Sequence, residues 1–96
     1  MTETECLRKK LEREIERPAH DFAKRNGWIA VKMMRTSVNG FPDHFFARGG
    51  RIVLIEFKAP GESPSRQQSR RHKDLREHGC EVFVVDSLDA AKEILK

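Results

Sequence analysis

The segment at residues 51–58, RIVLIEFK, restricts the possible folds of this chain more than any other. Side chains of a strand alternate between its two faces, so the apolar run from Ile52 to Ile55 would put apolar groups on both. Such a strand is typical of the interior of a sheet that is covered on both sides. We therefore predict an α/β fold with this segment as a central strand and Glu56 at its buried end.

The end of this strand gathers reactive side chains. Glu56 and Lys58 are two residues apart and therefore project from the same face. Asp43 follows the turn Gly40-Phe41-Pro42 and directly precedes a second strand, which forms a hairpin with the first. Two carboxylates and an ammonium group can then converge. Oxygen ligands of this kind hold a hard divalent cation, and the lysine would lie beside the water that the cation binds.

Each of these residues also has an ordinary structural role. Glu and Lys two residues apart on a strand usually form a solvated pair, and Asp43 could be a turn residue that supports the loop backbone. The position of Glu56 after four apolar residues favours the metal site, because an unpaired charge at a buried strand end is costly. We expect Asp43 and Glu56 to be metal ligands.

Length and charge narrow the choice of partner. At 96 residues and 11.1 kDa we expect one small domain over residues 1–96. The chain has 19 Lys and Arg against 15 Asp and Glu, which suggests a polyanionic partner such as nucleic acid.

Cys6 and Cys80 lack metal-type spacing, so we expect two free thiols in a reducing compartment. No apolar stretch reaches the ~20 residues of a membrane span. We expect a soluble, intracellular protein without a membrane partner.

Glycine and proline divide the chain into helices and strands. The predicted elements are a helix at residues 3–26, strands at 29–34, 44–48 and 51–58, a helix from 63 or 65 to about 78, a strand at 81–86 and a short final helix. Gly49 and Gly50 form the tight turn of the hairpin, and Ser87 caps the final helix. The order is helix, three strands, helix, strand, helix.

The first predicted helix contains a proline and a glutamate of interest. Pro18 clashes with the carbonyl of Glu14 in a regular helix, so we predict a kink or a break near that residue. Glu14 lies beside Ile15, at the border of the apolar face. It could form an ion pair with Lys10 or Arg17, or it could point toward the strands, and the sequence leaves both alternatives open.

Gln68 also has two interpretations. With Ser65 it fits a capping box, in which its side chain reaches back to the first backbone amide of the helix. Yet Gln68, His72 and Leu75 share one helical face, which would turn Gln68 inward toward the end of the central strand. Gln67 would then face solvent.

The remaining polar residues carry weaker signals. The four histidines lack the spacing of metal ligands, and we interpret them as surface or interface residues: His20, His44, His72 and His78. Two basic runs are ordinarily solvated helix faces, but in a nuclease they would be candidate phosphate contacts. They comprise Arg8, Lys9 and Lys10 in the first helix and Arg70, Arg71 and Lys73 in the second.

Several of these stretches together resemble the VRR-NUC family of virus-type replication and repair nucleases, within the PD-(D/E)XK nuclease superfamily. The likeness covers nearly the whole chain. The matching stretches are Glu14-Ile15-Glu16, Gly40-Phe41-Pro42-Asp43, Ile55-Glu56-Phe57-Lys58-Ala59-Pro60-Gly61, Gln68, and residues 82–87.

The resemblance implies a fold and a set of site residues. The fold would be a restriction-endonuclease-like αβββαβ core, with a mixed four-stranded sheet flanked by helices, plus a short C-terminal helix. Asp43, Glu56 and the Phe57 carbonyl would bind Mg²⁺ or Mn²⁺, and Lys58 would orient or activate the attacking water. Glu14 and Gln68 would support the site.

The implied function is a metal-dependent, structure-selective DNA endonuclease that hydrolyses phosphodiester bonds. Four-way (Holliday) junctions or flaps would be its branched substrates, and a homodimer could cut two strands of a symmetric junction. One alternative is a catalytically silent DNA-binding module, although such a module would not need Asp43, Glu56 and Lys58 together. A sequence-specific restriction enzyme would need more surface for reading bases. We expect the protein in the cytoplasm of a bacterial or phage-infected cell.

Overall fold

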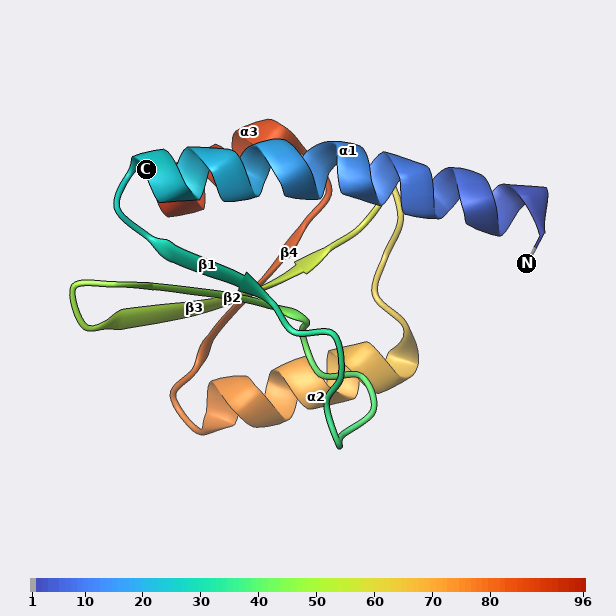
Figure 1. Cartoon of the computed structure of the whole chain (residues 1–96). Helices are drawn as coiled ribbons and strands as arrows, with labels where there is room; N and C mark the ends of the chain where they lie inside the picture. Colours follow the sequence, from blue (N-terminus) through green and yellow to red (C-terminus); the bar gives the residue numbers. More distant parts are fainter. Residues whose placement is uncertain (1) are drawn as a thin grey trace.

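Helices and strands follow one another in the predicted order (Figure 1). The computed structural model describes residues 2–96. Within these residues the elements are α1 (Glu3–Arg25), β1 (Ile29–Lys32), β2 (His44–Arg48), β3 (Arg51–Phe57), α2 (Arg66–Glu77), β4 (Glu81–Val85) and α3 (Leu88–Leu95). They form three layers, with α1 and α3 on one face of the sheet and α2 on the other (Figure 1). Among residues 2–96, no helix has the length and apolar character needed to cross a membrane.

The sheet is mixed, as the resemblance implied. Its strand order is β1-β2-β3-β4, with antiparallel pairing of β1 with β2 and of β2 with β3. β4 runs parallel to β3, and α2 provides the crossover between them. Gly49 and Gly50 both have positive φ, at 56° and 83°, which allows the two-residue turn between β2 and β3. β3 is therefore an interior strand.

The main core lies between the sheet and the α1/α3 layer. Ile15, Ala19 and Ala23 of α1 pack on the alternate residues of the strands that face them, including Phe46 and Ile55. These alanines are fully buried, so small side chains let α1 approach the sheet closely. The Trp28 indole donates a hydrogen bond to the Leu95 carbonyl at 2.8 Å, which ties α3 to the start of β1.

Three details of the sequence prediction were wrong. α1 is a continuous helix through Pro18, so the predicted break near Glu14 is wrong, while the alternative of a kink stays a prediction. Proline leaves the Glu14 carbonyl without its helical donor, but Glu14 is exposed, so water can satisfy that oxygen while the buried face holds the helix. β1 ends at Lys32 rather than at residue 34. Ile52 is 54% exposed, so the fully covered part of β3 begins at Val53.

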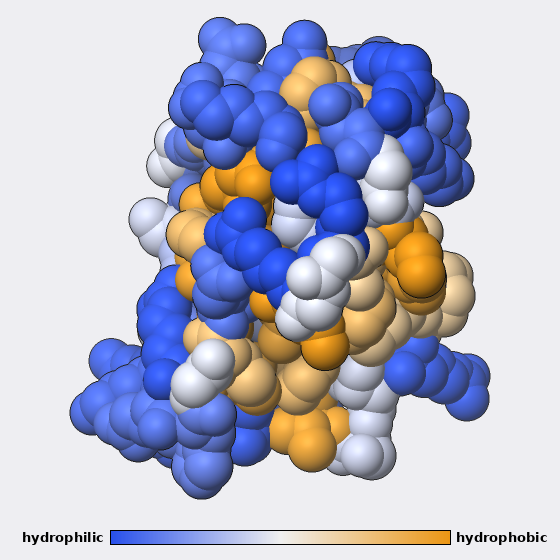
Figure 2. All heavy atoms as spheres, turned by 90° about the vertical axis from the view of Figure 1, so that its left-hand side faces the viewer, coloured by the Kyte–Doolittle hydropathy of each residue, from blue (hydrophilic) through white to orange (hydrophobic). Residues whose placement is uncertain are grey.

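The second face of the sheet is only partly covered. α2 packs against β4 and leaves side chains of the outer strands in contact with solvent, among them Ile29 and Val31. Figure 2 shows the end of the molecule that lies on the left of Figure 1, where hydrophobic atoms are exposed at mid-height and at the lower centre, between hydrophilic atoms. The covered part of that face lies toward the end of β3, where Glu56 is buried.

Candidate active site

The strand register sets Asp43 opposite Glu56. His44 of β2 pairs with Ile55 of β3, and continuing this antiparallel register by one residue brings Asp43 to Glu56. The Met33 amide donates to the Asp43 carbonyl at 2.7 Å, which holds the Asp43 backbone in line with β1. Cross-strand partners project from the same face, as do Glu56 and Lys58. The structure thus brings Asp43, Glu56 and Lys58 together at the end of the sheet.

Glu56 lies in surroundings that disfavour its charge. Its side chain is 9% exposed. Burial is the main cause that raises the pKa of Glu56 to about 7, and the negative charge of Asp43 adds to it, while Lys58 acts in the opposite direction. The carboxylates of Glu12 and Glu16 raise the pKa further. A carboxylate crowded by other carboxylates at one buried point is a place where added positive charge is stabilising.

Helix α1 contributes Glu12 and Glu16 to this cluster rather than Glu14. Glu12 and Glu16 are one helical turn apart, and the pKa of Glu12 is raised by burial and by Glu16 and Asp43, although Lys58 opposes the shift. Glu14 is exposed and lines a shallow hollow on the outer side of the helix, with Lys10 and other residues. The structure therefore does not bring Glu14 to the strands. Glu12, Glu16, Ala19 and Ala23 follow one another at steps of four, three and four residues, which places them on one helix face. Sequence analysis missed this signal.

Glu16 is held by two basic partners. Its Oε2 lies 3.2 Å from Lys32 Nζ and its Oε1 lies 3.4 Å from His44 Nε2. Burial on its own would raise the pKa of Glu16, but the His44 and Lys32 contacts outweigh it and lower the pKa. Glu16 is therefore ionised at neutral pH, whereas Glu56, with a pKa of about 7, is only partly ionised.

Two histidines interpreted as surface or interface residues are instead buried, each with 1% exposure. His44 faces the α1 side of the sheet, and its Nε2 lies 3.3 Å from Asp43 Oδ1. Its Nδ1 shares a 2.8 Å hydrogen bond with His20 Nε2, and its ring packs edge-on against Phe57 at 4.7 Å. Burial and the nearby His44 lower the pKa of His20 to about 4. The interpretation failed because it relied on ligand spacing and not on the strand register.

The second buried histidine supports Glu56 from the opposite layer. His72 of α2 places its Nε2 3.5 Å from Glu56 Oε1. Burial lowers the pKa of His72, and the charges of Arg76 and Lys58 lower it further. Each strand carboxylate thus has a buried imidazole beside it, one from β2 and one from α2.

The capping-box interpretation of Gln68 is confirmed. The Ser65 hydroxyl accepts from the Gln68 amide at 3.1 Å, and Gln68 Oε1 accepts from the Ser65 amide at 2.9 Å. Gln68 is also half-buried and one turn before His72, whereas Gln67 is exposed. The cap occupies the amide oxygen of Gln68.

The residues present fit a divalent cation. Glu56 Oε1 is buried without a hydrogen-bond partner within residues 2–96, and a cation would satisfy that oxygen. In the same residues no three His, Cys, Asp or Glu side chains are grouped as ligands of one metal. A cation at Asp43 and Glu56 would therefore need a backbone oxygen, such as that of Phe57, and waters. Mg²⁺ is commonly bound in this way, with few protein ligands.

Comparison with known proteins identifies the family. The sequence profile of the VRR-NUC domain matches residues 4–89. The chain belongs to the VRR-NUC family. The match spans the whole site from Glu12 to His72, and it assigns the chain to a family of nucleases.

Individual relatives agree with this VRR-NUC assignment. A protein named "Putative nuclease p44", from Acyrthosiphon pisum secondary endosymbiont phage 1, is 38% identical over 79 residues, which are 81% of this chain and 85% of the relative. A solved structure described as "VRR_NUC domain" has a TM-score of 0.78 and 26% identity, over 86% of this chain and 91% of that chain. Another, described as "VRR_NUC domain protein", has a TM-score of 0.68 and 19% identity, over 86% and 83% of the two chains, and shares the fold.

The basic runs of this VRR-NUC domain lie on the helices near the site. Arg8, Lys9 and Lys10 are exposed on the part of α1 that extends beyond the sheet (Figure 1). Arg70 and Lys73 are exposed on α2. Arg71 differs, because it is half-buried and lies 3.6 Å from Asp74.

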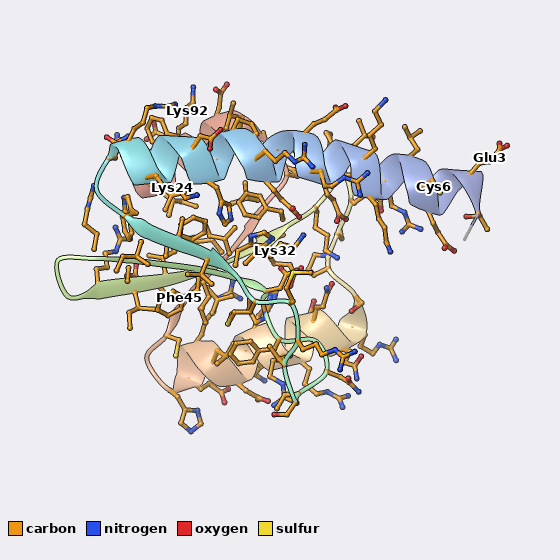
Figure 3. The ribbon with its side chains drawn as sticks, in the orientation of Figure 1. Glu3, Cys6, Lys24, Lys32, Phe45 and Lys92 are labelled. Atoms are coloured by element: carbon orange, nitrogen blue, oxygen red, sulfur yellow. The ribbon has the colours of Figure 1, made fainter. Side chains whose placement is uncertain are left out.

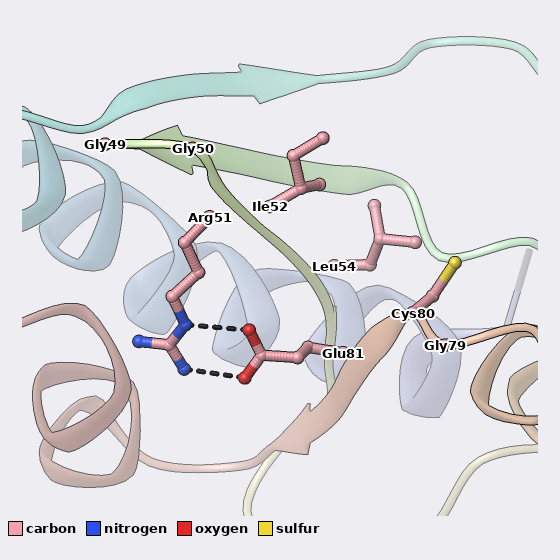
Figure 4. Close-up of a pocket in the computed structure, with 8 residues that line it drawn as sticks. All are labelled: Gly49, Gly50, Arg51, Ile52, Leu54, Gly79, Cys80 and Glu81. Carbon is pink, nitrogen blue, oxygen red and sulfur yellow. Dashed lines mark hydrogen bonds and ion pairs between the residues drawn. The ribbon is translucent and has the colours of Figure 1, made fainter.

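A hollow at the far end of β3 is separate from this cluster (Figure 4). It has a volume of about 530 Å³ and is lined by Ile52, Leu54 and Cys80 among others. Its charged residues neutralise each other, since Arg51 donates two hydrogen bonds of 2.7 Å to the Glu81 carboxylate. Cys80 is a free, exposed thiol, like Cys6 on α1. The crowded carboxylates Asp43 and Glu56 thus lie at the opposite end of β3 from this hollow.

Proposed function

We propose that this protein is a metal-dependent endonuclease that hydrolyses phosphodiester bonds in DNA. The observation that carries the proposal is the crowding of Asp43 and Glu56, with Glu56 Oε1 buried and without a partner in residues 2–96. Such a carboxylate pair favours a bound divalent cation, and Lys58 beside it favours a reaction with an anionic substrate. Membership of a nuclease family supports the same conclusion.

The residues at the end of β3 and before β2 would have distinct roles in hydrolysis. Asp43, Glu56 and the Phe57 carbonyl would hold Mg²⁺ or Mn²⁺. When bound, the cation would stabilise the negative charge that develops on the phosphate oxygens and would lower the pKa of the attacking water. Lys58, which is half-buried, would orient that water and donate a hydrogen bond to the phosphate.

The remaining polar residues would position these groups. Glu16 is ionised and contacts His44, so it would keep the Asp43 side of the site in place. His72 would restrict the orientation of Glu56 from the other side of the sheet. Gln68 would fix the start of α2, and with it the position of His72 one turn later.

The proposed substrate is branched DNA, either a four-way junction or a flap, cut by a homodimer. A homodimer would supply two sites related by two-fold symmetry, which suits paired cuts in a symmetric junction. Exposed cations on the two helices would contact phosphates without reading sequence: Arg8, Lys9, Lys10, Arg70 and Lys73, with Arg71 after release from Asp74.

Metal binding tests the proposal directly. Calorimetric titration of the wild type with Mn²⁺ should give a binding signal that Asp43→Ala and Glu56→Ala each abolish. Glu62→Ala, which removes an exposed carboxylate from the loop after β3, is the matched control. Both site variants should also lose cleavage of labelled four-way, flap, duplex and single-stranded DNA in Mg²⁺ or Mn²⁺. Unchanged Mn²⁺ binding in both variants would rule out the assignment.

The substrate and assembly need a second experiment. Light scattering at assay concentration should give about twice the 11.1 kDa chain mass, and a four-way junction should receive paired cuts near its branch point. A monomeric mass together with equal cleavage of plain duplex would remove the case for a junction resolvase. A wild type that binds DNA and cleaves none of it would instead indicate a catalytically silent binding module.

A further inference from the structure

A groove between α1 and β1 runs into the proposed active site. Its volume is about 480 Å³, and its walls carry the cationic side chains of Arg13, Arg17 and Lys24 from α1 and of Lys32 from β1. Figure 3 shows Lys24 below α1 and Lys32 beside the end of β1, on the side that faces the viewer. These residues belong to neither of the basic runs that stood out in the sequence.

The cations of this groove are mostly free of carboxylate partners. Within residues 2–96, Arg13, Arg17 and Lys24 form no ion pair, whereas Lys32 pairs with Glu16. Asp21 is the other carboxylate of the lining. His20 stays neutral at pH 7, with a pKa of about 4 that follows from its burial and its contact with His44. The excess positive charge of the groove therefore comes from Arg13, Arg17 and Lys24 and not from His20.

The groove and the carboxylate cluster share a wall. Glu16 and His44 line the groove, and His44 Nε2 lies 3.3 Å from Asp43 Oδ1. A polyanionic chain lying along α1 in this groove would therefore reach Asp43 directly. None of the basic residues at 8–10 or on the outside of α2 lines this groove, and Arg8 and Lys9 line a separate hollow that meets the cluster at Glu12.

Size indicates which form of polyanion fits. A hollow of about 480 Å³ is in the range that holds a drug-sized molecule, and so takes nucleotides of one strand rather than a double helix. Arg13 and Lys24 are eleven residues apart on α1, which spans about 16 Å at 1.5 Å per residue. Three cations spread over that length suit successive phosphates of a single strand.

We propose that this groove binds the phosphodiester backbone of a single-stranded DNA segment adjoining the cleaved phosphate, through Arg13, Arg17 and Lys24. The assignment rests on the proposed nuclease function, because it takes Asp43 as the reaction centre. To the nuclease function it adds a binding site for the DNA backbone beside the cleaved phosphate. It also predicts a preference for substrates that have an unpaired strand next to the cut.

The test compares two triple variants that remove the same charge. The groove variant is Arg13→Ala/Arg17→Ala/Lys24→Ala, and the control is Arg25→Ala/Lys92→Ala/Lys96→Ala, whose residues are exposed and lie outside the groove. Alanine suits helix interiors, and melting curves show whether both variants fold. Fluorescence anisotropy without divalent cation measures binding of a labelled single strand and of a blunt duplex over a range of salt concentrations.

The groove variant should bind the single strand at least about thirtyfold more weakly at low salt, and its salt slope should fall by about two, as expected for three lost contacts. The control variant should change both quantities much less, and the duplex should be affected less than the single strand. Equal losses in the two variants, an equal loss on duplex, or a wild type without affinity for single strands would overturn the proposal. Cleavage in Mg²⁺ is measured separately. If the wild type cleaves no DNA, but the groove variant still binds the single strand more weakly than the wild type does, the nuclease function alone is refuted.

Discussion

His72 Nε2 lies 3.5 Å from Glu56 Oε1, and neither atom has a hydrogen-bond partner within residues 2–96. Because burial, Arg76 and Lys58 all lower the pKa of His72, its ring is neutral at pH 7 and does not compensate a charge on Glu56. This is why Glu56 keeps a raised pKa although a histidine lies beside it. The Glu56 carboxylate therefore has no positive charge from His72 to stabilise it, and a bound cation would provide that charge.

The raised pKa of Glu56 predicts a pH-dependent stability effect. Below about pH 4.5 the carboxyl is protonated in both folded and unfolded chains, so it contributes no difference. As the pH rises toward 7 the unfolded chain releases the proton first, so the folded state loses up to about 3 kcal/mol, the equivalent of moving the pKa from 4.5 to about 7. Glu56→Gln should therefore melt higher than the wild type at pH 8 and equally at pH 4, without divalent cation.

Melting curves of the two proteins across this pH range measure the effect. His20 titrates in the opposite direction, but it is common to both proteins and does not contact Glu56, so its effect cancels in the difference. His72 lies 3.5 Å from Glu56, so the measured difference includes the change that the substitution makes in its titration. Glu62→Gln makes the same substitution at an exposed position and is the control. A constant difference between wild type and Glu56→Gln from pH 4 to pH 8 would contradict the raised pKa.

Glu16→Gln and Glu14→Gln form a matched pair on α1. Glu16 contacts Lys32 and His44, so its neutral amide should lower turnover at least about tenfold, or ~1.4 kcal/mol in the barrier. Glu14 is exposed and outside the cluster, so its substitution should leave turnover near that of the wild type. Single-turnover rates on saturating DNA distinguish them, and loss of activity in Glu14→Gln alone would show that the outer face of α1 is the functional one.

Gln68→Ala tests how the helix cap contributes. Loss of the capping box should cost about 0.5–2 kcal/mol of stability. Gln68 also precedes His72 by one turn, so we expect turnover to fall at least about tenfold as well. Gln67→Ala should match the wild type in both melting temperature and rate. A Gln68→Ala variant that melts earlier but cleaves at the wild-type rate would limit Gln68 to capping.

Gly40 holds the loop before Asp43 against the start of α2. It has a φ of +77°, and a Cβ there would lie 2.8 Å from the Gln67 carbonyl oxygen and 3.1 Å from the Gln68 amide. Gly40→Ala should therefore cost at least about 2 kcal/mol, from backbone strain plus displacement of α2, and should impair cleavage. Gly61→Ala is the control, with a φ of +80° but open space around its Cβ, and should cost only about 1–2 kcal/mol. Thermal melting measures the loss of stability in each variant. Equal losses in Gly40→Ala and Gly61→Ala would contradict the prediction.

Several features could be predicted from the sequence because they depend on near neighbours in the chain. The two-residue alternation of a strand was enough to put Glu56 and Lys58 on one face, and Ser65 and Gln68 are three residues apart in a motif that closes on itself. The Gly49-Gly50 turn similarly defined the hairpin that carries Asp43 to Glu56. Each of these relations involves at most one turn or one strand pair.

Layer packing was beyond such local rules. The spacing of Glu12 and Glu16 from Ala19 and Ala23 indicates that they share a helix face, but only the packing of these alanines on the sheet decides that this face meets the strands. His44 and His72 are 28 positions apart in separate layers, so their burial beside Asp43 and Glu56 depends on long-range pairing and on the crossover through α2. Electrostatic energy depends on distance and burial in space, and neither quantity is contained in the local pattern of residues.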